Sequence, residues 1–165
     1  RPPSDVLDPR VKSLNYLNNV LAKREAKLRH ADDALLLNAQ GRVAESAGAN
    51  LFIVRRGALQ TPPASEGALE GVTRRSILEL ARAESATLGL RVEEVPLARA
   101  DVLDADEVFL TGSGAGVARV ATLDGVALRD GRDPAAPGKP RVSEQLFSAL
   151  VELAKTASTP FRHAG

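Results

Sequence analysis

The sequence predicts an α+β fold in which strands pair mostly as hairpins and helices flank them. Three observations favour this class. The chain has 165 residues, the size of one domain. Its 44% hydrophobic and 26% charged residues are ordinary for a globular protein with a core. Apolar segments separated by hairpin turns outnumber strands that alternate singly with helices, which argues against a doubly wound parallel sheet.

The composition excludes several classes of function. Lys and Arg (22) nearly balance Asp and Glu (21), and 3% of residues are aromatic, so a nucleic-acid-binding surface is not expected. The absence of cysteine excludes disulfides and thiolate chemistry, and two distant histidines argue against a metal centre. No apolar run approaches the ~20 residues that span a membrane, and the N-terminus lacks a signal-peptide pattern. We therefore expect a cytoplasmic protein that binds no membrane.

The start of the chain is unusual. The sequence contains no methionine and begins with Arg1, and a bulky residue in second position blocks removal of an initiator methionine. We therefore expect a piece of a longer protein. Residues 1–10 carry three prolines and are predicted to form a linker.

The first half of the chain predicts one helix followed by short strands. Leucines at helical spacing indicate an amphipathic helix over 13–29. The segment 38–41 and the pair Arg56-Gly57 favour turns between strands, and Pro62-Pro63 ends the last of them. The strands are expected at 34–37, 42–45, 50–55 and 58–61.

The second half predicts a mixture of helices and hairpin strands. The expected order is a helix over 73–88 closing at Gly89, a strand over 91–97, a helical turn over 98–105 and a strand over 107–111. Asp124-Gly125 predicts a hairpin between 117–123 and 126–128. The Pro-rich segment 133–140 is expected to be an exposed loop, and a last helix begins near Val142.

Two titratable side chains stand at boundaries between predicted elements. Lys12 lies between the Pro-rich start and the first helix. Its position alone favours a solvated lysine, and the alternative is an amine that forms a Schiff base. Glu45 precedes the small residues 46–49. Its position alone favours a solvated turn carboxylate, and the alternative is a group that faces a planar ligand.

Two further segments are candidate anion sites. Gly71-Val72-Thr73 opens a helix, whose free N–H groups attract anions, although the segment by itself favours a plain helix cap. The run 111–116 (Thr-Gly-Ser-Gly-Ala-Gly) is not a dinucleotide fingerprint, because Val117 replaces the third glycine and the next residues alternate like a strand. Ser113 and Gly114 of this run can still offer hydroxyl and N–H groups to a phosphate.

The order of these segments resembles the C-terminal half of the fold-type IV pyridoxal-phosphate enzymes, the class IV aminotransferases. The resemblance rests on the blocks 12–17, 36–52, 69–74 and 105–112, and extends from about Val11 to Gly131. It is closest to the branched-chain and D-amino-acid aminotransferases. It implies the family's C-terminal large domain over 11–165, a twisted and mostly antiparallel pseudo-barrel sheet with flanking helices. Residues 1–10 become the linker from a missing N-terminal domain.

The resemblance also implies pyridoxal 5′-phosphate as cofactor and gives each site residue a role. Lys12 is expected to hold the cofactor as a Schiff base and to move the proton between Cα and C4′. Glu45 is expected to pair with the pyridine nitrogen. Tyr16 is expected to bond the ring 3′ oxygen, and Leu69 to pack on the ring. The phosphate is expected to lie among Gly71, Val72, Thr73, Ser113 and Gly114.

The activity implied is transfer of an amino group between a branched-chain or D-amino acid and a 2-oxo acid, by a homodimer. In this family an N-terminal domain supplies a phosphate-binding arginine and much of the substrate pocket. Two alternatives stay open at this point: an aminodeoxychorismate lyase of the same family, and a catalytically silent interaction domain. The chain departs from the family pattern at Glu70, Gly116 and Ala118-Arg119, and in an insertion around 84–86.

Overall fold

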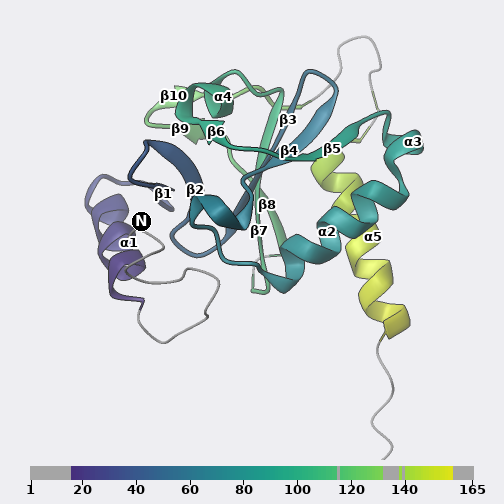
Figure 1. Cartoon of the computed structure of the whole chain (residues 1–165), viewed down its shortest axis with the longest axis horizontal. Coiled ribbons are helices and arrows are strands. Elements are labelled where there is room, and N and C mark those ends of the chain that lie inside the picture. The colour runs from purple at the N-terminus through teal and green to yellow at the C-terminus, as the bar shows by residue number, and fades with distance from the viewer. Residues whose placement is uncertain (1–15, 115, 132–137, 139, 158–165) are drawn as a thin grey trace, which may run out of the picture.

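The computed structural model describes residues 16–114, 116–131, 138 and 140–157 (Figure 1). Lys12 and the predicted linker lie outside these residues. The helices are α1 (Leu17–Leu28), η1 (Ala64–Glu66), α2 (Val72–Ala83), α3 (Ser85–Leu88), α4 (Arg99–Leu103) and α5 (Val142–Ala157). The strands are β1 (Leu35–Leu37), β2 (Arg42–Ser46), β3 (Asn50–Arg55), β4 (Ala58–Thr61), β5 (Arg91–Glu94), β6 (Leu97–Ala98), β7 (Glu107–Gly112), β8 (Gly116–Arg119), β9 (Thr122–Leu123) and β10 (Val126–Ala127).

The described strands form three sheets. One has five strands in the order β5-β4-β3-β7-β8, one has three in the order β1-β2-β6, and β9 pairs with β10. The pairing of β4 with β5 is parallel, and the other pairings among these strands are antiparallel. The predicted α+β class and mostly antiparallel sheet are confirmed, and the described strands do not close into a barrel.

The central strand β3 separates two hydrophobic cores. Successive side chains of a strand point to opposite faces. Phe52 and Val54 therefore face one core with α2 and α5, whereas Leu51 and Ile53 face the other with β2, β6 and α4. On the first face Phe52 stacks on Phe109 of β7, with ring centroids 5.4 Å apart. Burial of each such side chain stabilises the fold by roughly 1.5–3 kcal/mol.

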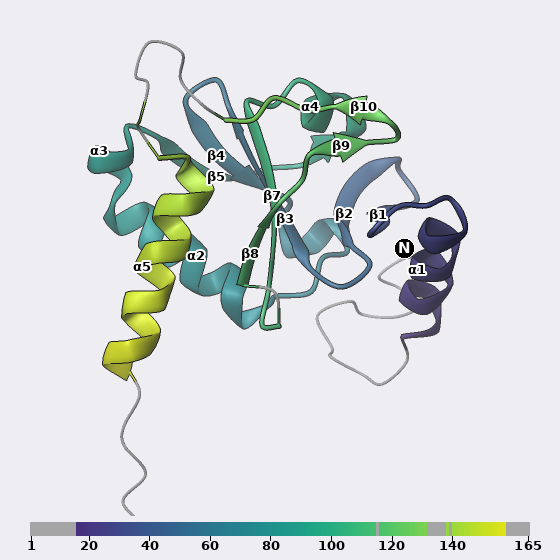
Figure 2. The same cartoon turned by 180° about the vertical axis from the view of Figure 1, so that it is seen from behind.

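Two helices, α2 and α5, cover the first of these faces. In both views α2 and α5 lie side by side against the five-stranded sheet, while α1 lies at the opposite end of the molecule beside β1 (Figures 1 and 2). None of the helices in the described part of the chain is both long and apolar enough to cross a lipid bilayer.

Two predicted hairpins are confirmed by their backbone angles. Arg56 and Gly57 both have positive φ (51° and 70°) and join β3 to β4. Asp124 and Gly125 do the same between β9 and β10, with φ of 50° and 79°. Positive φ at both central residues matches the right-handed twist of the flanking strands, which is why these residue pairs are informative in sequence.

Three predicted elements are wrong in extent. The strand expected over 91–97 is two strands in different sheets, because Pro96 has no N–H for a sheet bond and the chain changes sheet there. The strand expected over 117–123 divides between β8, paired with β7, and β9, paired with β10. The helix expected over 73–88 breaks at Glu84, where φ is −98° and ψ is 11°, inside the segment taken as an insertion. Its predicted end at Gly89 is confirmed by a left-handed φ of 66°.

The last helix is attached to the sheet through a buried carboxylate. Glu107 at the start of β7 is 1% exposed and accepts hydrogen bonds from the N–H groups of Val142 and Ser143, at 3.1 and 3.3 Å. The Ser143 hydroxyl donates to the same carboxylate. Burial raises the pKa of Glu107 above its ordinary value, although the bonds from Ser143 and Val142 act in the opposite direction. Glu107 therefore caps α5 from the core side.

The raised pKa of Glu107 gives a pH-dependent term in stability. The folded state holds this proton more tightly than the unfolded chain, so the free energy of unfolding contributed by the group falls as pH rises above about 4.5. Glu107→Gln keeps an acceptor oxygen and is expected to make that fall shallower. Glu107→Ala leaves the start of α5 unpaired and is expected to cost about 1–3 kcal/mol.

Denaturant titrations between about pH 4 and pH 8 measure both effects. Glu152→Gln, at an exposed ion pair with Lys155 on the same helix, is the control. An identical pH dependence for the wild type and Glu107→Gln would contradict this account.

Candidate functional site

Glu45 is a buried carboxylate within β2. It is 5% exposed and lies in a strand paired on one side with β1 and on the other with β6. Its Oε2 accepts a hydrogen bond from the Leu69 N–H at 2.9 Å and one from Asn50 Nδ2 at 3.4 Å. A buried charge is tolerated where donors replace its water. The solvated turn carboxylate, one of the two interpretations of this position, is therefore wrong.

Asn50 connects this carboxylate to the segment before α2. It is 6% exposed at the first position of β3, and its Nδ2 also donates to the Leu69 carbonyl at 2.7 Å. The Asn50 amide, the Glu45 carboxylate and the Leu69 peptide group are therefore joined by three hydrogen bonds. This set of bonds fixes the main chain of Leu69 two residues before Gly71.

The start of α2 directly follows this set. Gly71 takes the capping position, and within the described part of the chain no side chain caps the helix. A Cβ on Gly71 would lie 2.4 Å from Asn50 Oδ1, so the close approach requires glycine. Val72 and Thr73 form the first turn, whose N–H groups have no partner inside the helix. The start of α2 is thus suited to an anion.

The glycine-rich turn joins β7 to β8 beside the same region. Asn50 pairs with Thr111 across the sheet, and a Cβ on Gly112 would lie 3.6 Å from the Gly48 carbonyl oxygen. Both cartoon views place this turn next to the start of α2 (Figures 1 and 2). Ser113 and Gly114 are exposed in the turn. The turn is followed by the strand β8, whereas a dinucleotide fingerprint would be followed by a helix, so the prediction that this run is not such a fingerprint is confirmed.

Tyr16 lies at the start of α1, near the loop that follows Glu45. It is half-buried, and its carbonyl accepts the Val20 N–H at 2.9 Å. The buried Asn19 donates from Nδ2 to the Ala47 carbonyl at 3.0 Å and so attaches the first turn of α1 to that loop. Contacts with Asn50 and with the β2–β3 loop thus bring Glu45, Leu69, Gly71 and the β7–β8 turn to one end of β3, and α1 is attached to the same loop. Their contacts with a cofactor stay predictions, as does the role of Lys12.

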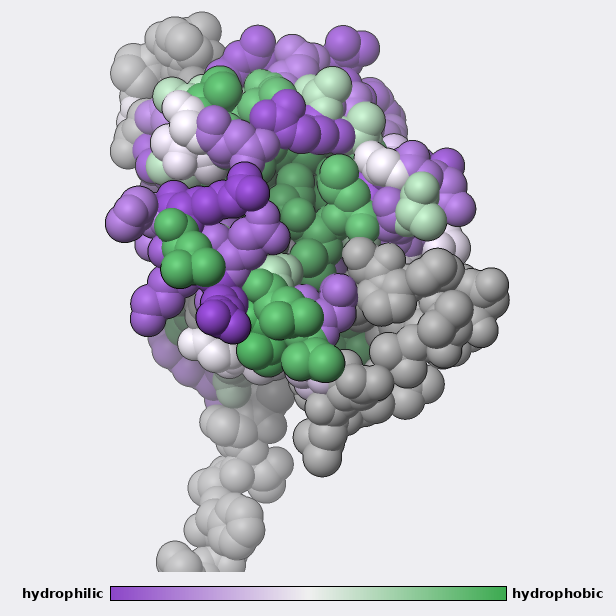
Figure 3. Space-filling view, turned by 90° about the vertical axis from the view of Figure 1, so that its left-hand side faces the viewer, coloured by the Kyte–Doolittle hydropathy of each residue, from purple (hydrophilic) through white to green (hydrophobic). Residues whose placement is uncertain are grey.

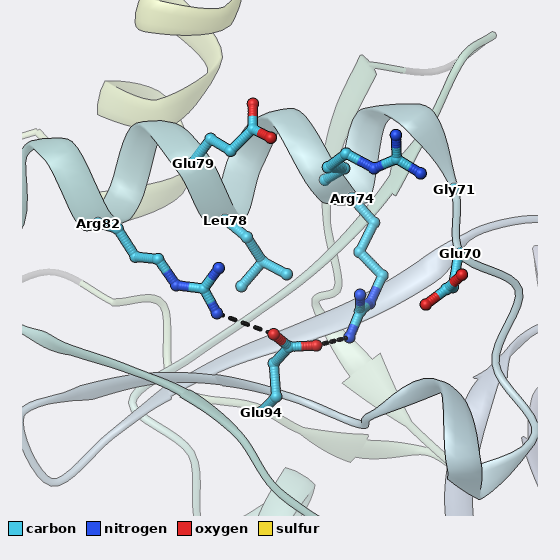
Figure 4. Close-up of a pocket in the computed structure, with 8 residues that line it drawn as sticks. Glu70, Gly71, Arg74, Leu78, Glu79, Arg82 and Glu94 are labelled. Carbon is cyan, nitrogen blue, oxygen red and sulfur yellow. Dashed lines mark hydrogen bonds and ion pairs between the residues drawn. The ribbon is translucent and has the colours of Figure 1, made fainter.

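A polar cavity of about 180 Å³ lies between α2 and the end of β5, lined by Glu70, Gly71, Arg74, Arg75, Leu78, Glu79, Arg82 and Glu94 (Figure 4). Its central contact holds α2 on β5. The buried Arg74 donates to Glu94 at 2.7 Å and to the Pro62 carbonyl at 2.9 Å, and Arg82 bonds the other Glu94 oxygen at 2.8 Å. The hydrogen bond from Arg74 lowers the pKa of Glu94. These ion pairs give Arg74, Arg82 and Glu94 a structural role.

Sequence reasoning gave Asn50 and Asn19 no role. Each is a buried polar residue. The available signal for Asn50 was a lone amide at the head of the apolar run 51–54. The apolar run therefore indicated that the amide is buried. It did not identify the hydrogen-bond partner, because Leu69 is 19 residues away.

Comparisons with known proteins give a consistent result. A family model described as amino-transferase class IV matches residues 1–123. A Methanocaldococcus jannaschii protein named as a branched-chain-amino-acid aminotransferase is 47% identical over 125 residues, which are 76% of this chain and 42% of that protein. The chain thus spans less than half the length of this curated relative.

Solved structures agree with the sequence matches. The branched-chain amino acid aminotransferase from Thermobaculum terrenum in its PLP form superposes with a TM-score of 0.82 at 38% identity, over 96% of this chain and 49% of that chain. A Legionella pneumophila protein named as a 4-amino-4-deoxychorismate lyase superposes with a TM-score of 0.78 at 32% identity, over 92% of this chain and 52% of that chain.

The hydrogen-bonded set around Glu45 is expected to contribute to stability without any ligand. Glu45→Ala removes the acceptor of the part-buried Leu69 N–H, which is expected to lower the free energy of unfolding by about 1–3 kcal/mol. Glu70→Ala is the control. Glu70 is the exposed neighbour of Leu69, so its removal is expected to change the free energy of unfolding by less than about 0.5 kcal/mol. Denaturant titration without added cofactor gives both values. Equal losses in the two variants would contradict the buried set.

Proposed function

Because the chain belongs to the class IV aminotransferase family, we propose that the intact protein is a pyridoxal-phosphate-dependent transaminase. It moves an amino group between an amino acid and a 2-oxo acid. The observation that carries this proposal is the juxtaposition of the buried Glu45 carboxylate with the start of α2 through Leu69 and Asn50.

The residues present fit the cofactor at two of its ends. A protonated ring nitrogen calls for a carboxylate, and the buried, donor-held Glu45 provides one. A phosphate calls for N–H and hydroxyl donors, which the start of α2 and the exposed Ser113 provide. The bound cofactor would supply an electron sink for the carbanion at the substrate Cα.

Each residue of the chain then has a defined task. Lys12, which lies outside the described residues, would hold the cofactor aldehyde through Nζ with loss of water. Once the substrate amine had replaced it, the freed Nζ amine would move the proton from the substrate Cα. Glu45 holds the proton on the ring nitrogen. Tyr16 donates to the ring oxygen, and Leu69 packs on the ring. Val72, Thr73, Ser113 and Gly114 hold the phosphate, with Gly71 allowing the main chain to come close.

Branched-chain amino acids are the proposed donors. Support comes from the names of the Methanocaldococcus and Thermobaculum relatives, which are branched-chain aminotransferases. D-amino acids, the other substrate class that the resemblance implied, enter as a comparison in the assay below.

The rest of the intact protein is proposed to cover an apolar face of α1. Leu17, Val20, Leu21 and Leu28 recur at helical spacing, as the sequence predicted, yet they are 54–72% exposed in this structure. Figure 3 looks onto this side of the molecule and shows apolar side chains at its surface. Apolar patches of this kind mark interaction surfaces. We infer that the N-terminal half or a second copy, in a homodimer, packs here and completes the substrate pocket.

The assignment of Lys12 has a direct chemical test. Borohydride reduction of the intact, cofactor-loaded protein is expected to fix the cofactor on Lys12, because reduction makes the carbon–nitrogen bond permanent. Peptide mass mapping locates the adduct. Lys12→Ala is expected to abolish the adduct. Lys23→Ala is the control and is expected to retain it, because Lys23 of α1 forms an ion pair with Asp33. An adduct on another lysine overturns the assignment.

The reaction itself separates transaminase, lyase and silent domain. We expect keto-acid-dependent amino transfer from branched-chain amino acids to exceed transfer from D-amino acids and pyruvate release from aminodeoxychorismate. Pyruvate release is included because the chain is similar to the Legionella protein named as a lyase. Faster pyruvate release favours the lyase. No turnover, together with no absorbance near 410–430 nm on addition of cofactor, favours a silent domain (the range is roughly that of imine-forming lysines).

A further inference from the structure

We propose that Asn50 is a positioning residue that sets the distance between the two cofactor-binding ends of the site. The inference rests on the proposed function. It adds a residue that acts through Glu45 and Leu69 and that is not itself expected to touch the cofactor.

The first step is the direction of its hydrogen bonds. Nδ2 donates to the Leu69 carbonyl at 2.7 Å and to Glu45 Oε2 at 3.4 Å, so one amide nitrogen bridges a carboxylate and a peptide oxygen. The Leu69 N–H returns a bond to the same Oε2 at 2.9 Å. Because Oε2 has two donors on it, rotation of the carboxylate is restricted.

The second step is the contact on the other side of the amide. Asn50 Oδ1 lies against Gly71, where a Cβ would approach to 2.4 Å. Gly71 has φ −63° and ψ 142°, which any residue can adopt, so the neighbouring amide alone excludes a larger side chain. One side chain therefore contacts Glu45, Leu69 and the cap of α2.

The third step is what this bridge controls. Glu45 is expected at the ring nitrogen and the start of α2 at the phosphate, and both groups belong to one small cofactor molecule whose ring carries the phosphate on a short arm. The spacing between the two must match the cofactor. Asn50 is the first residue of β3, a strand whose side chains are buried in both cores. Packing of this strand therefore holds the backbone of Asn50 in place.

Two variants of the intact protein separate positioning from packing. Asn50→Ala removes the amide. Asn50→Asp keeps its shape but cannot donate to the Leu69 carbonyl and places a second carboxylate beside Glu45. If the bridge positions the site, both variants weaken cofactor binding by roughly tenfold or more, and Asp is at least as harmful as Ala. If Asn50 only fills space, Asp is milder than Ala.

A spectroscopic signature adds a readout that packing would not move. Loose positioning of Glu45 weakens its hold on the ring-nitrogen proton, so the Lys12–cofactor imine becomes more basic. The pH midpoint of its absorbance band is expected to rise in Asn50→Ala and Asn50→Asp. Asn38→Ala is the matched control, since Asn38 bonds Glu66 at 2.6 Å in a structural turn. It is expected to lower stability and leave the midpoint unchanged.

Gly71→Ala tests the bridge without cofactor. Its added methyl group is expected to lower the free energy of unfolding in the presence of Asn50, and to cost less in the Asn50→Ala background, where the space is open. Additive effects of the two substitutions overturn the contact.

The outcomes distinguish the two proposals. A wild-type protein that forms no imine overturns the proposed function and this inference with it. A wild-type protein that forms the imine on Lys12, with Asn50→Asp matching it in cofactor affinity and pH midpoint, overturns the inference alone. A midpoint shift in Asn38→Ala equal to that in Asn50→Ala also overturns it.

Discussion

A carboxylate buried between two paired strands has to find its hydrogen-bond donors inside the protein. Glu45 obtains them from Leu69 and from Asn50, which belong to different segments of the chain. An unsatisfied buried charge costs several kcal/mol, so the folded chain has to bring the segment before α2 across the β2–β3 loop. That single requirement fixes where α2 begins, and therefore where its unpaired N–H groups point.

The sheet makes this arrangement rigid. β3 has apolar side chains on both faces, and its first residue is Asn50, so the polar site sits at the end of the most buried strand. The register that places Asn50 opposite Thr111 also brings the glycine-rich turn to the β2–β3 loop. A slip of one residue would exchange the two cores, because side chains alternate between faces. Packing on both sides of β3 thus sets the geometry of a site that lies at its edge.

Much of the fold could be predicted from local signals, and the failures have physical causes. The hairpins at Arg56-Gly57 and Asp124-Gly125 were predictable because few residue pairs accept two positive φ angles. Local patterns do not show a change of partner, so the segments 91–97 and 117–123 were predicted as single strands although each joins two sheets. The break at Glu84 carries no proline or glycine, and its only signal in the sequence was the departure from the family pattern around 84–86. The leucines of α1 gave the right helix, but periodicity marks an apolar face without showing what covers it.

The sequence predicted which residues belong to the site, because the order of the segments resembles the family, but it did not predict their hydrogen bonds. Position alone favoured a solvated carboxylate at Glu45, whereas the side chain is buried, and the resemblance, not the spacing, gave it a role. The hydrogen bonds that decide the matter join residues 5 and 24 apart, beyond the reach of any local pattern. The groups expected to orient the ring and phosphate are held by contacts within the described residues, whereas the apolar face of α1 remains exposed. Under the proposed function, the described residues therefore supply contacts to the ring nitrogen and the phosphate, and the exposed face of α1 is where we propose that the rest of the intact protein packs.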